Sequence, residues 1–261
     1  MTRRETDMTR LFRALALCLG LFVAPLAALA QTATPSFTPQ QRQQIETIVR
    51  EYLLANPELL RELFGALETR ENAAQARAQA EIIARNREQL TGNARHAVLG
   101  NPRGDVTIVE FFDYNCGFCK RAAGDMRELL RTDPNVRLVL KEFPVLGPPS
   151  VEAAQISAQL HAHPRFGDFH ARLLAAEGQA NRASAVAIAR ELGIDTRRIE
   201  AEMRAQDTMA RIEEVYGLAN ALSIGGTPTY VIGDEVVVGA VGLGELRRRV
   251  TAMRQCGRTS C

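Results

Sequence analysis

The stretch VTIVEFFDYNCGFCK, residues 106–120, decides the fold of this chain. Its first half, residues 106–112, is rich in β-branched and aromatic side chains and predicts a buried strand. Cys116 and Cys119 follow directly, and residues 121–131 then have the composition of a helix. This succession of strand, cysteine pair and helix predicts that Cys116 lies at a helix N-terminus.

A helix N-terminus favours the chemistry of a reactive thiol. Its unpaired backbone N–H groups and the helix dipole stabilise negative charge, so the thiolate of Cys116 is favoured over the thiol. The thiolate is the species that attacks a disulfide, and a cysteine three residues later can resolve the mixed disulfide that forms. We therefore expect Cys116 to attack and Cys119 to resolve.

A C-x-x-C pair also occurs in metal-binding proteins, but a structural zinc site needs a second matching pair. The remaining candidates, Cys256 and Cys261, have a looser spacing and are expected to form a local disulfide in the C-terminal tail. The sequence thus favours redox chemistry, with no cofactor and no metal site; copper binding by Cys116 and Cys119 is the alternative. Three histidines without a matching carboxylate pattern are interpreted as surface or packing residues: His161, His163 and His170.

Residues 1–30 have the pattern of a secretory signal peptide. Arg10 and Arg13 precede an apolar run that ends in Ala-Leu-Ala at residue 30. The run is shorter than the roughly 20 residues that a membrane-spanning helix needs, and Pro25 interrupts it. We expect cleavage after Ala30 and export to the periplasm, where disulfides persist.

The charge balance argues against a nucleic-acid partner. The whole chain has 32 Lys and Arg against 30 Asp and Glu. Loss of residues 1–30 would remove four arginines and two acidic residues, which leaves no net charge. The basic run at residues 247–249 lies in a helical pattern and is expected on a solvated face, so no basic stripe remains to neutralise phosphates.

Residues 31–90 predict a helical N-terminal segment. Thr38 and Pro39 have the pattern of a helix start, and Asn56-Pro57 ends that helix and begins another. Residues 68–90 are then rich in Ala, Arg, Glu and Gln, which is typical of an exposed or self-associating helix. Large apolar side chains recur at helical spacing without enough neighbouring chain to cover them, which favours self-association: Ile45, Ile48, Val49, Tyr52, Leu53, Leu59, Leu60, Leu63, Phe64 and Leu67.

Residues 91–255 predict an α/β domain, followed by a short tail at 256–261. A β-α-β half and a β-β-α half are separated by a helical insertion, which begins at the Gly-Pro-Pro sequence of residues 147–149. Besides the strand and helix already described, the expected elements are strands at 136–143, 229–232 and 235–238, an insertion at about 147–205, and helices at 208–222 and 244–253.

The sequences FFDYNCGFCK at 111–120 and GTPTY at 226–230 resemble the DsbA family of bacterial periplasmic proteins, over roughly residues 96–255. The chain is most similar to the branch with a helical N-terminal extension, which includes the suppressor-of-copper-sensitivity proteins. The resemblance implies a thioredoxin fold with a helical insertion and thiol-disulfide oxidoreductase activity. It also implies a homo-oligomer, with a trimer favoured, assembled through residues 38–90.

The resemblance assigns roles to further residues. Pro228, preceded by Thr227, matches a cis-proline that faces the cysteine pair, and the Thr227 backbone would pair with an extended substrate peptide. Glu110 matches a buried acid that moves protons to and from Cys119. An ionisable group in an apolar strand is costly unless paired, and Lys141 in the next apolar strand is the expected partner.

The residues between the cysteines bear on the direction of the reaction. The strongly oxidising family member has Pro-His there, whereas Gly117 and Phe118 offer no donor or charge to stabilise a thiolate. The pair is expected to be less oxidising, which suits an isomerase or a reductase, and Phe118 is expected to contact unfolded substrate. The implied partners are unfolded or misoxidised exported proteins and a membrane redox protein, either a DsbD/ScsB-like reductase or a DsbB-like oxidase. A monomeric DsbA-type oxidase and a non-catalytic scaffold are alternatives.

Overall fold

The computed structural model describes residues 37–92, 95–202 and 205–261. The chain divides into two compact units, one that extends to Ala66 and one from Leu67 to Cys261. The signal peptide predicted for residues 1–30 lies outside the described residues. None of the described helices is long and apolar enough to cross a membrane.

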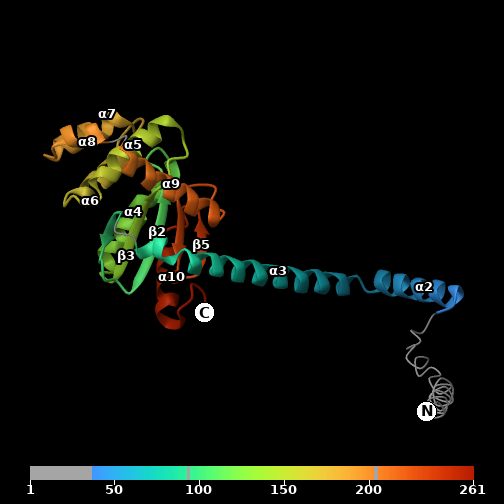
Figure 1. The fold of residues 1–261 in the computed structure, drawn as a ribbon. Helices are drawn as coiled ribbons and strands as arrows, with labels where there is room; N and C mark the ends of the chain where they lie inside the picture. Colours follow the sequence, from blue (N-terminus) through green and yellow to red (C-terminus); the bar gives the residue numbers. More distant parts are fainter. Residues whose placement is uncertain (1–36, 93–94, 203–204) are drawn as a thin grey trace, which may run out of the picture. The chain divides into compact units, whose positions relative to one another are not determined.

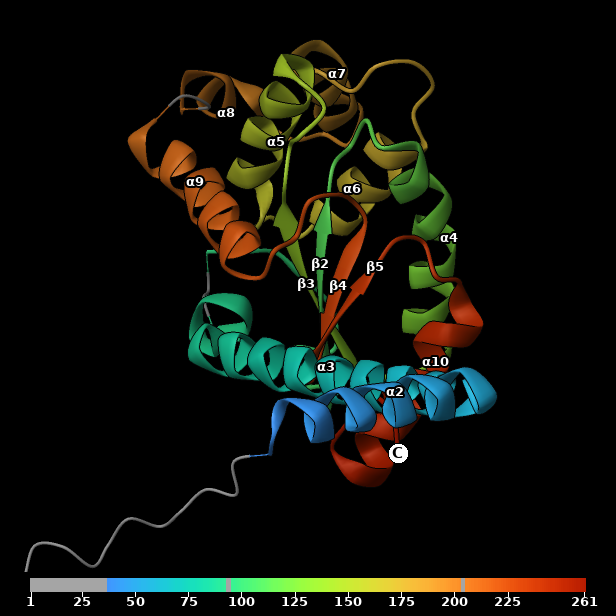
Figure 2. The same ribbon diagram turned by 90° about the vertical axis from the view of Figure 1, so that its right-hand side faces the viewer.

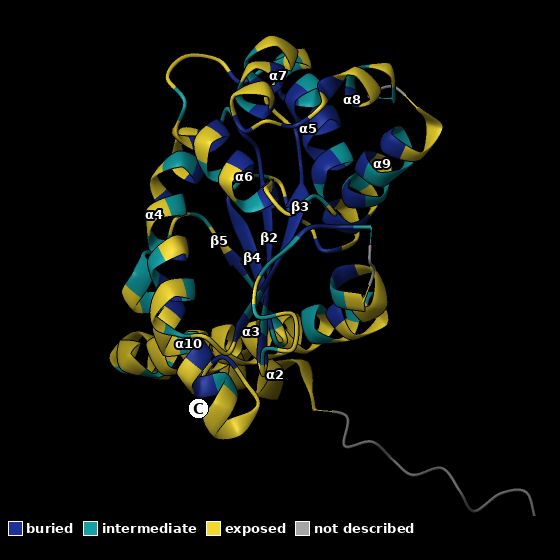
Figure 3. Cartoon of the chain, turned by 90° about the vertical axis from the view of Figure 1, so that its left-hand side faces the viewer, coloured by how far each residue is buried: buried dark blue, intermediate teal, exposed yellow. Residues whose placement is uncertain are grey.

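The N-terminal segment forms two helices, α2 (Pro39–Ala55) and α3 (Pro57–Arg85). The Thr38 hydroxyl accepts the backbone N–H of Gln41, whose side chain accepts the N–H of Thr38 in return, so the predicted helix start is confirmed. The predicted break at Asn56-Pro57 is also found. Within the described residues, α2 buries no side chain and α3 buries only Ile83, and both helices are largely exposed in Figure 3.

The second unit is built on a five-stranded mixed sheet of order β1-β3-β2-β4-β5. Figure 1 labels three of these strands, β2, β3 and β5. The two central strands, β2 and β3, are parallel, and the other pairings are antiparallel. The strands are β1 (Val98–Gly100), β2 (Val106–Phe112), β3 (Val136–Glu142), β4 (Thr229–Ile232) and β5 (Glu235–Val238). All but β1 lie where the sequence predicts a strand.

Helices cover both faces of this sheet. The helices α4 (Gly117–Thr132) and α10 (Leu243–Cys256) lie on one face, and α9 (Gln206–Ala221) lies on the other, as Figure 2 shows. Successive residues of β2 point to opposite faces, so Ile108 joins the first core and Val109 the second. The α/β fold class expected from the sequence is confirmed.

The end of the N-terminal segment belongs to the core of the second unit. Ile83 at the end of α3 and Leu90 in the π-helical turn Glu88–Gly92 are buried in one cluster with Phe111 and Val139. Burying each such side chain contributes about 1.5–3 kcal/mol. The division after Ala66 therefore differs from the domain boundary expected near residue 91.

The predicted insertion consists of helices α5 (Pro148–Leu160), α6 (Phe166–Ala175), α7 (Arg182–Glu191) and α8 (Thr196–Glu202). Helix α5 is its centre, because it contacts α7, α8 and α9, while α6 contacts α4. The insertion thus packs beside the start of α4, where the cysteine pair lies.

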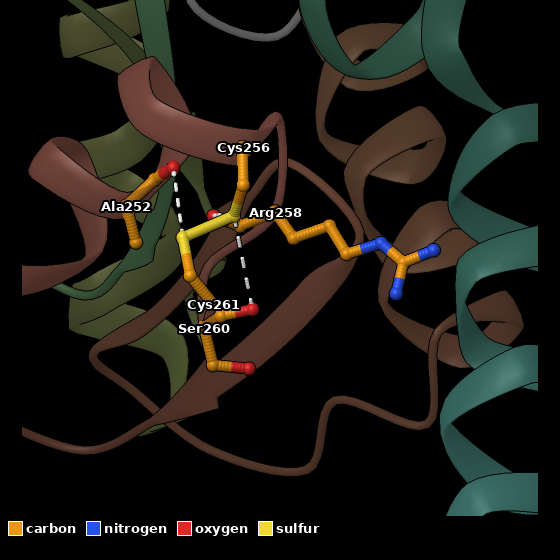
Figure 4. Close-up of a disulfide and its surroundings, with 5 residues drawn as sticks. All are labelled: Ala252, Cys256, Arg258, Ser260 and Cys261. Carbon is orange, nitrogen blue, oxygen red and sulfur yellow. Dashed lines mark hydrogen bonds between the residues drawn. A yellow bond between two sulfur atoms is a disulfide. The ribbon is translucent and has the colours of Figure 1, made fainter.

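The C-terminal tail is closed by a disulfide between Cys256 and Cys261, which confirms the predicted pairing (Figure 4). Helix α10 continues to Cys256 and ends at Gly257, whose φ of 72° is a left-handed conformation that glycine adopts readily. So short a loop restricts the unfolded chain only slightly, so the bond is a local clip.

Candidate active site

Cys116 is the N-cap residue of α4, directly after the loop that leaves β2. Its N–H donates to the carbonyl of Asp113 at 3.0 Å, and its carbonyl accepts the N–H of Lys120 at 3.0 Å. Cys116 and Cys119 are both free thiols in this structure, with exposed fractions of 6% and 1%. The predicted position of Cys116 at a helix N-terminus is confirmed, and Cys116 is the more accessible sulfur.

The peptide bond between Thr227 and Pro228 is cis, as the resemblance implies. The thiol of Cys116 donates to the Thr227 carbonyl at 3.1 Å. Thr227 is half-buried and Pro228 is buried, immediately before β4 begins at Thr229. Two segments far apart in the sequence therefore meet at the Cys116 sulfur: the N-terminus of α4 and the half-buried Thr227 before β4.

Cys119 is the more deeply buried thiol, and this burial raises its pKa. The nearby charges of Cys116 and Glu110 raise the pKa further, while hydrogen bonds from the Asp113 backbone and the Thr227 side chain oppose the shift. Cys119 is therefore protonated in the reduced protein. In the role that the resemblance implies, attack on a mixed disulfide, this thiol would first have to lose its proton.

Glu110 is the ionisable group to which the resemblance assigns this proton transfer, and it lies close enough to Cys119 to raise the pKa of that thiol. It is buried in β2, opposite Leu140 of β3 and Tyr230 of β4, and burial raises the pKa of its carboxyl to about 8. The Tyr230 hydroxyl beside it is also buried and has no hydrogen-bond partner among the described residues.

A cavity of about 110 Å³ reaches Glu110 between β2, β3, α4 and α6. A water needs about 10–15 Å³ of such space, so the cavity can hold several. Its lining includes Glu110, Met126, Arg127, Leu130, Leu138 and Leu174. Water in this cavity would give the carboxyl a route for exchanging its proton with solvent.

Lys141 is not the partner of Glu110, which corrects the sequence prediction. In the register of the two strands Glu110 lies opposite Leu140, while Lys141 lies opposite Phe111 and so points to the other face of the sheet. Its ammonium group donates to the Gln89 carbonyl at 2.6 Å, and burial lowers the pKa of Lys141 to about 8. A catalytic role for Lys141 through Glu110 is therefore not supported.

The raised pKa of Glu110 predicts that the stability of the folded protein depends on pH. Its pKa in the folded protein, about 8, lies above the ordinary value of 4.5, so the folded state holds a proton that the unfolded state releases between these pH values. Stability is therefore expected to fall as pH rises from 5 to 8. Glu110→Gln should remove this slope and raise the free energy of unfolding at pH 8 by a few kcal/mol, because a tenfold difference in proton affinity between the two states corresponds to about 1.4 kcal/mol.

Urea unfolding of both proteins at pH 5 and pH 8 measures this effect. Glu46→Gln, at an exposed position of α2, is a matched control that should leave the pH slope unchanged. An equal slope in the wild type and in Glu110→Gln would show that Glu110 titrates normally.

The active-site loop is held by a buried carboxylate that the sequence pattern does not reveal. Asp113 accepts the N–H of Asn115 at 2.7 Å, the N–H of Leu146 at 3.0 Å and the hydroxyl of Ser150 at 2.8 Å. The Asn115 side chain in turn exchanges two hydrogen bonds with the backbone of Ala180. These bonds fasten the loop before Cys116 to the helical insertion.

A second series of buried hydrogen bonds begins at Tyr114, the residue after Asp113. The Tyr114 hydroxyl lies 2.8 Å from the Ser157 hydroxyl and 3.1 Å from Nδ1 of His170, and Ser157 donates to Glu142 at 2.8 Å. Glu142 also accepts from Nε2 of His161 at 2.6 Å. His161 therefore does have a carboxylate partner, contrary to its interpretation from sequence.

Exposed apolar side chains border the loop. Phe118, between the cysteines, is 58% exposed, and the Arg121 guanidinium lies 4.2 Å from its ring centroid. Val145 and Leu146 are also exposed, in the segment that hydrogen-bonds Asp113. The Phe118 ring is therefore accessible from solvent, and its contact with unfolded substrate stays a prediction.

Comparison with known protein families finds two matching parts of this chain. Residues 107–251 match the DSBA-like thioredoxin domain, and residues 41–74 match the N-terminal domain of the copper resistance protein ScsC. A thioredoxin-like oxidoreductase from Silicibacter pomeroyi is 40% identical, with a TM-score of 0.63 over 66% of this chain and 99% of that one.

Two further solved structures have 27% identity. The thiol-disulfide exchange protein α-DsbA2 of Wolbachia pipientis has a TM-score of 0.64 over 69% of this chain and 98% of its own. Proteus mirabilis ScsC, in a transitional conformation, has a TM-score of 0.60 over 81% of this chain and 94% of its own. The match to ScsC extends beyond the second unit, Leu67–Cys261.

The chain spans about a quarter of the length of the curated relatives it matches. One is a Na⁺/H⁺ antiporter of Salinispora arenicola, 29% identical over 160 residues, which are 60% of this chain and 24% of the antiporter. The family match, by contrast, covers more than half of this chain and includes both cysteines, the cis-proline and Glu110. The chain belongs to the DsbA-like thioredoxin family of thiol-disulfide oxidoreductases.

Proposed function

We propose that this protein rearranges or reduces disulfides in exported proteins of the periplasm. The observation that carries the proposal is the Cys116 thiol, which lies at the N-terminus of α4 and 3.1 Å from the carbonyl of Thr227. This arrangement supports a nucleophile beside a backbone edge on which a substrate peptide can dock.

The proposed reaction starts with the Cys116 thiolate. It attacks one sulfur of a substrate disulfide, forms a mixed disulfide and releases the other sulfur as a thiolate, which takes up a proton. In isomerisation, a different substrate thiolate attacks the mixed disulfide and regenerates Cys116, so no electrons are gained or lost. In reduction, Cys119 gives its proton to the ionised form of Glu110 and attacks the Cys116 sulfur of the mixed disulfide. The bond between Cys116 and the substrate breaks, the second substrate sulfur leaves as a thiolate that takes up a proton, and the enzyme is oxidised by two electrons.

The residues around the pair support the isomerase and reductase directions over oxidation. Gly117 and Phe118 provide no hydrogen-bond donor or charge that would stabilise the thiolate beyond the helix N-terminus. The exposed ring of Phe118 is suited to segments of unfolded or misoxidised clients, in which apolar side chains are accessible. A reduced pair would need electrons from a DsbD/ScsB-like membrane reductase, whereas a DsbB-like partner would make the protein an oxidase.

The N-terminal helices support assembly into a homo-oligomer, for which we propose a trimer. Ile48, Tyr52, Leu63 and Phe64 are each more than half exposed. The match of residues 41–74 to the ScsC N-terminal domain indicates that this segment is a distinct module. Several thiol pairs in one assembly would allow a bound client to meet more than one of them, which favours isomerisation.

The periplasm is proposed from two observations. Residues 1–30 have the pattern of a signal peptide, and a thioredoxin-like protein of Salmonella enterica serovar Typhimurium, 26% identical, is described as periplasmic. Disulfide exchange on clients is sustained in such an oxidising compartment.

The recovery of activity from scrambled ribonuclease tests the proposal. The reduced protein should accelerate recovery in a redox buffer, whereas oxidation of fully reduced ribonuclease should be accelerated much less. The reverse pattern would identify a dithiol oxidase. Copper binding by the cysteine pair is the second candidate, because the N-terminal match is to a copper resistance protein; stoichiometric Cu⁺ binding without any thiol exchange would favour it.

A further inference from the structure

Three side chains converge on one buried point away from the cysteine pair. His96 precedes β1, Glu142 ends β3, and His161 follows the last residue of α5. One ligand atom from each, two imidazole nitrogens and a carboxylate oxygen, lie within 4.8 Å of one another. The side chains are 1%, 4% and 4% exposed, so the cluster is shielded from bulk solvent.

His96 is the member of the cluster whose burial is not explained by hydrogen bonds among the described residues. Both of its ring nitrogens are buried, and neither has a hydrogen-bond partner within the described part of the chain. The carboxylate of Glu214 lies 3.5 Å from Nε2, but an ion pair with it requires a protonated imidazole. A neutral imidazole of this kind presents a lone pair without a bound hydrogen.

The other two side chains are oriented as metal ligands are. Nδ1 of His161 lies 2.9 Å from the Arg95 carbonyl, which can only accept, so Nδ1 carries a hydrogen and Nε2 faces Glu142. Metal-binding histidines characteristically donate their second N–H to a carbonyl or carboxylate in this way. Glu142 is itself held by the Ser157 hydroxyl at 2.8 Å.

We propose that His96, Glu142 and His161 bind a divalent transition-metal ion of the zinc type. Two imidazoles and one carboxylate are a known Zn²⁺ ligand set, with the fourth position of the tetrahedron left to water. Bonds of about 2.0–2.1 Å place tetrahedral ligand atoms about 3.3 Å apart, so His161 and Glu142 separate slightly and His96 moves inward. The ion replaces the proton that joins His161 to Glu142.

The charges around the cluster are compatible with a cation. Lys141 and Arg211 oppose it, but the ammonium group of Lys141 donates to the Gln89 carbonyl at 2.6 Å and the Arg211 guanidinium is paired with Asp207. Glu142 and Glu214 both contribute negative charge to the surroundings of His96. The site is independent of Cys116 and Cys119, whose sulfurs are not among its ligands.

Metal uptake would tie three distant segments together. His96 lies in the segment between the π-helical turn and β1, Glu142 in the sheet, and His161 in the helical insertion. Glu142 is also linked through Ser157 to Tyr114 in the active-site loop. A bound ion is therefore expected to raise the melting temperature of the second unit.

Metal binding is measured on the oxidised protein, in which a Cys116–Cys119 disulfide removes the competing thiolates. Equilibrium dialysis with Zn²⁺ should give one bound ion per chain and an increased melting temperature. Titration with Co²⁺ should give the visible spectrum of a four-coordinate nitrogen and oxygen site, without a thiolate charge-transfer band. No uptake of Zn²⁺ or Co²⁺ by the wild type overturns the proposal.

His96→Gln separates metal binding from folding, because it leaves the Glu142–His161 pair intact. It should weaken Zn²⁺ binding by at least about 100-fold, the upper end of what loss of a supporting residue costs. His163→Ala, in the same insertion but outside the cluster, is the matched control and should bind Zn²⁺ as the wild type does. Unchanged affinity in His96→Gln, or an equal loss in His163→Ala, would contradict the assignment.

Discussion

Cys116→Ala is expected to abolish catalysis of disulfide exchange. The sulfur of Cys116 is the one at the helix N-terminus and beside the Thr227 carbonyl, whereas Cys119 is more deeply buried and burial raises the pKa of its thiol. Loss of a catalytic nucleophile typically reduces the rate by about 10³-fold or more. Reduction of insulin by dithiothreitol, with and without the enzyme, should therefore proceed at the uncatalysed rate in this variant.

Cys119→Ala should have a different effect that identifies its role. Cys116 can still attack a substrate, but the enzyme has no second active-site thiol to release it, so mixed disulfides accumulate and can be detected by mass spectrometry after acid quenching. The matched control replaces Cys256 and Cys261, whose disulfide is a local clip in the tail, and should retain full activity. Turnover by Cys116→Ala, or trapping by Cys116→Ala rather than Cys119→Ala, would reverse the assignment.

The parts of the fold that sequence predicts well are those set by local pattern. The β2 strand is a run of β-branched and aromatic residues, and the cysteine pair directly before a helical stretch fixes Cys116 as its N-cap. The capping pair of Thr38 and Gln41 is equally local. Strand β1 escapes prediction because a three-residue strand ending at Gly100 has too little pattern to detect.

Strand register limits what the sequence says about the site. Glu110 and Lys141 are both charged residues in apolar strands, and pairing them is the natural prediction. The parallel register places Glu110 opposite Leu140, and a difference of one position moves a side chain to the other face of the sheet. The sequence around Glu110 and Lys141 does not reveal the register of the two strands. The predicted pairing is therefore wrong, although both residues are buried as expected.

The buried polar networks depend on long-range contacts. Tyr114 meets Ser157, and Glu142 meets His161, through hydrogen bonds that join the active-site loop and β3 to the insertion. Each residue alone resembles an ordinary surface or packing residue. The one signal that the sequence offers is Glu142 itself, a carboxylate at the end of an apolar strand, which would require a partner if it were buried.

Charged substitutions in the exposed apolar stripe of α3, formed by Leu63 and Phe64, are expected to dissociate the proposed homo-oligomer. Leu63 and Phe64 of α3 are 55% and 67% exposed, so the described residues of their own chain bury neither side chain. Burial of each side chain is worth about 1.5–3 kcal/mol, so copies of the stripe covering one another would gain substantially from these two positions alone. Leu63→Glu with Phe64→Glu replaces that gain with the cost of burying charges.

The wild type is therefore expected to have the mass of a homo-oligomer by light scattering, and the double variant the mass of a single chain. The double variant should remain folded and keep its thiol exchange with small disulfides, because the cysteine pair lies in the other unit. It should lose activity on scrambled ribonuclease if several cysteine pairs must act on one client. Glu62→Gln, at an exposed polar position of the same helix turn, is the matched control and should remain assembled. If the wild type is itself monomeric across the concentration range, the apolar stripe does not drive self-association. The argument for an isomerase then loses its support from assembly, since one thiol pair per molecule is as well suited to a DsbA-type oxidase.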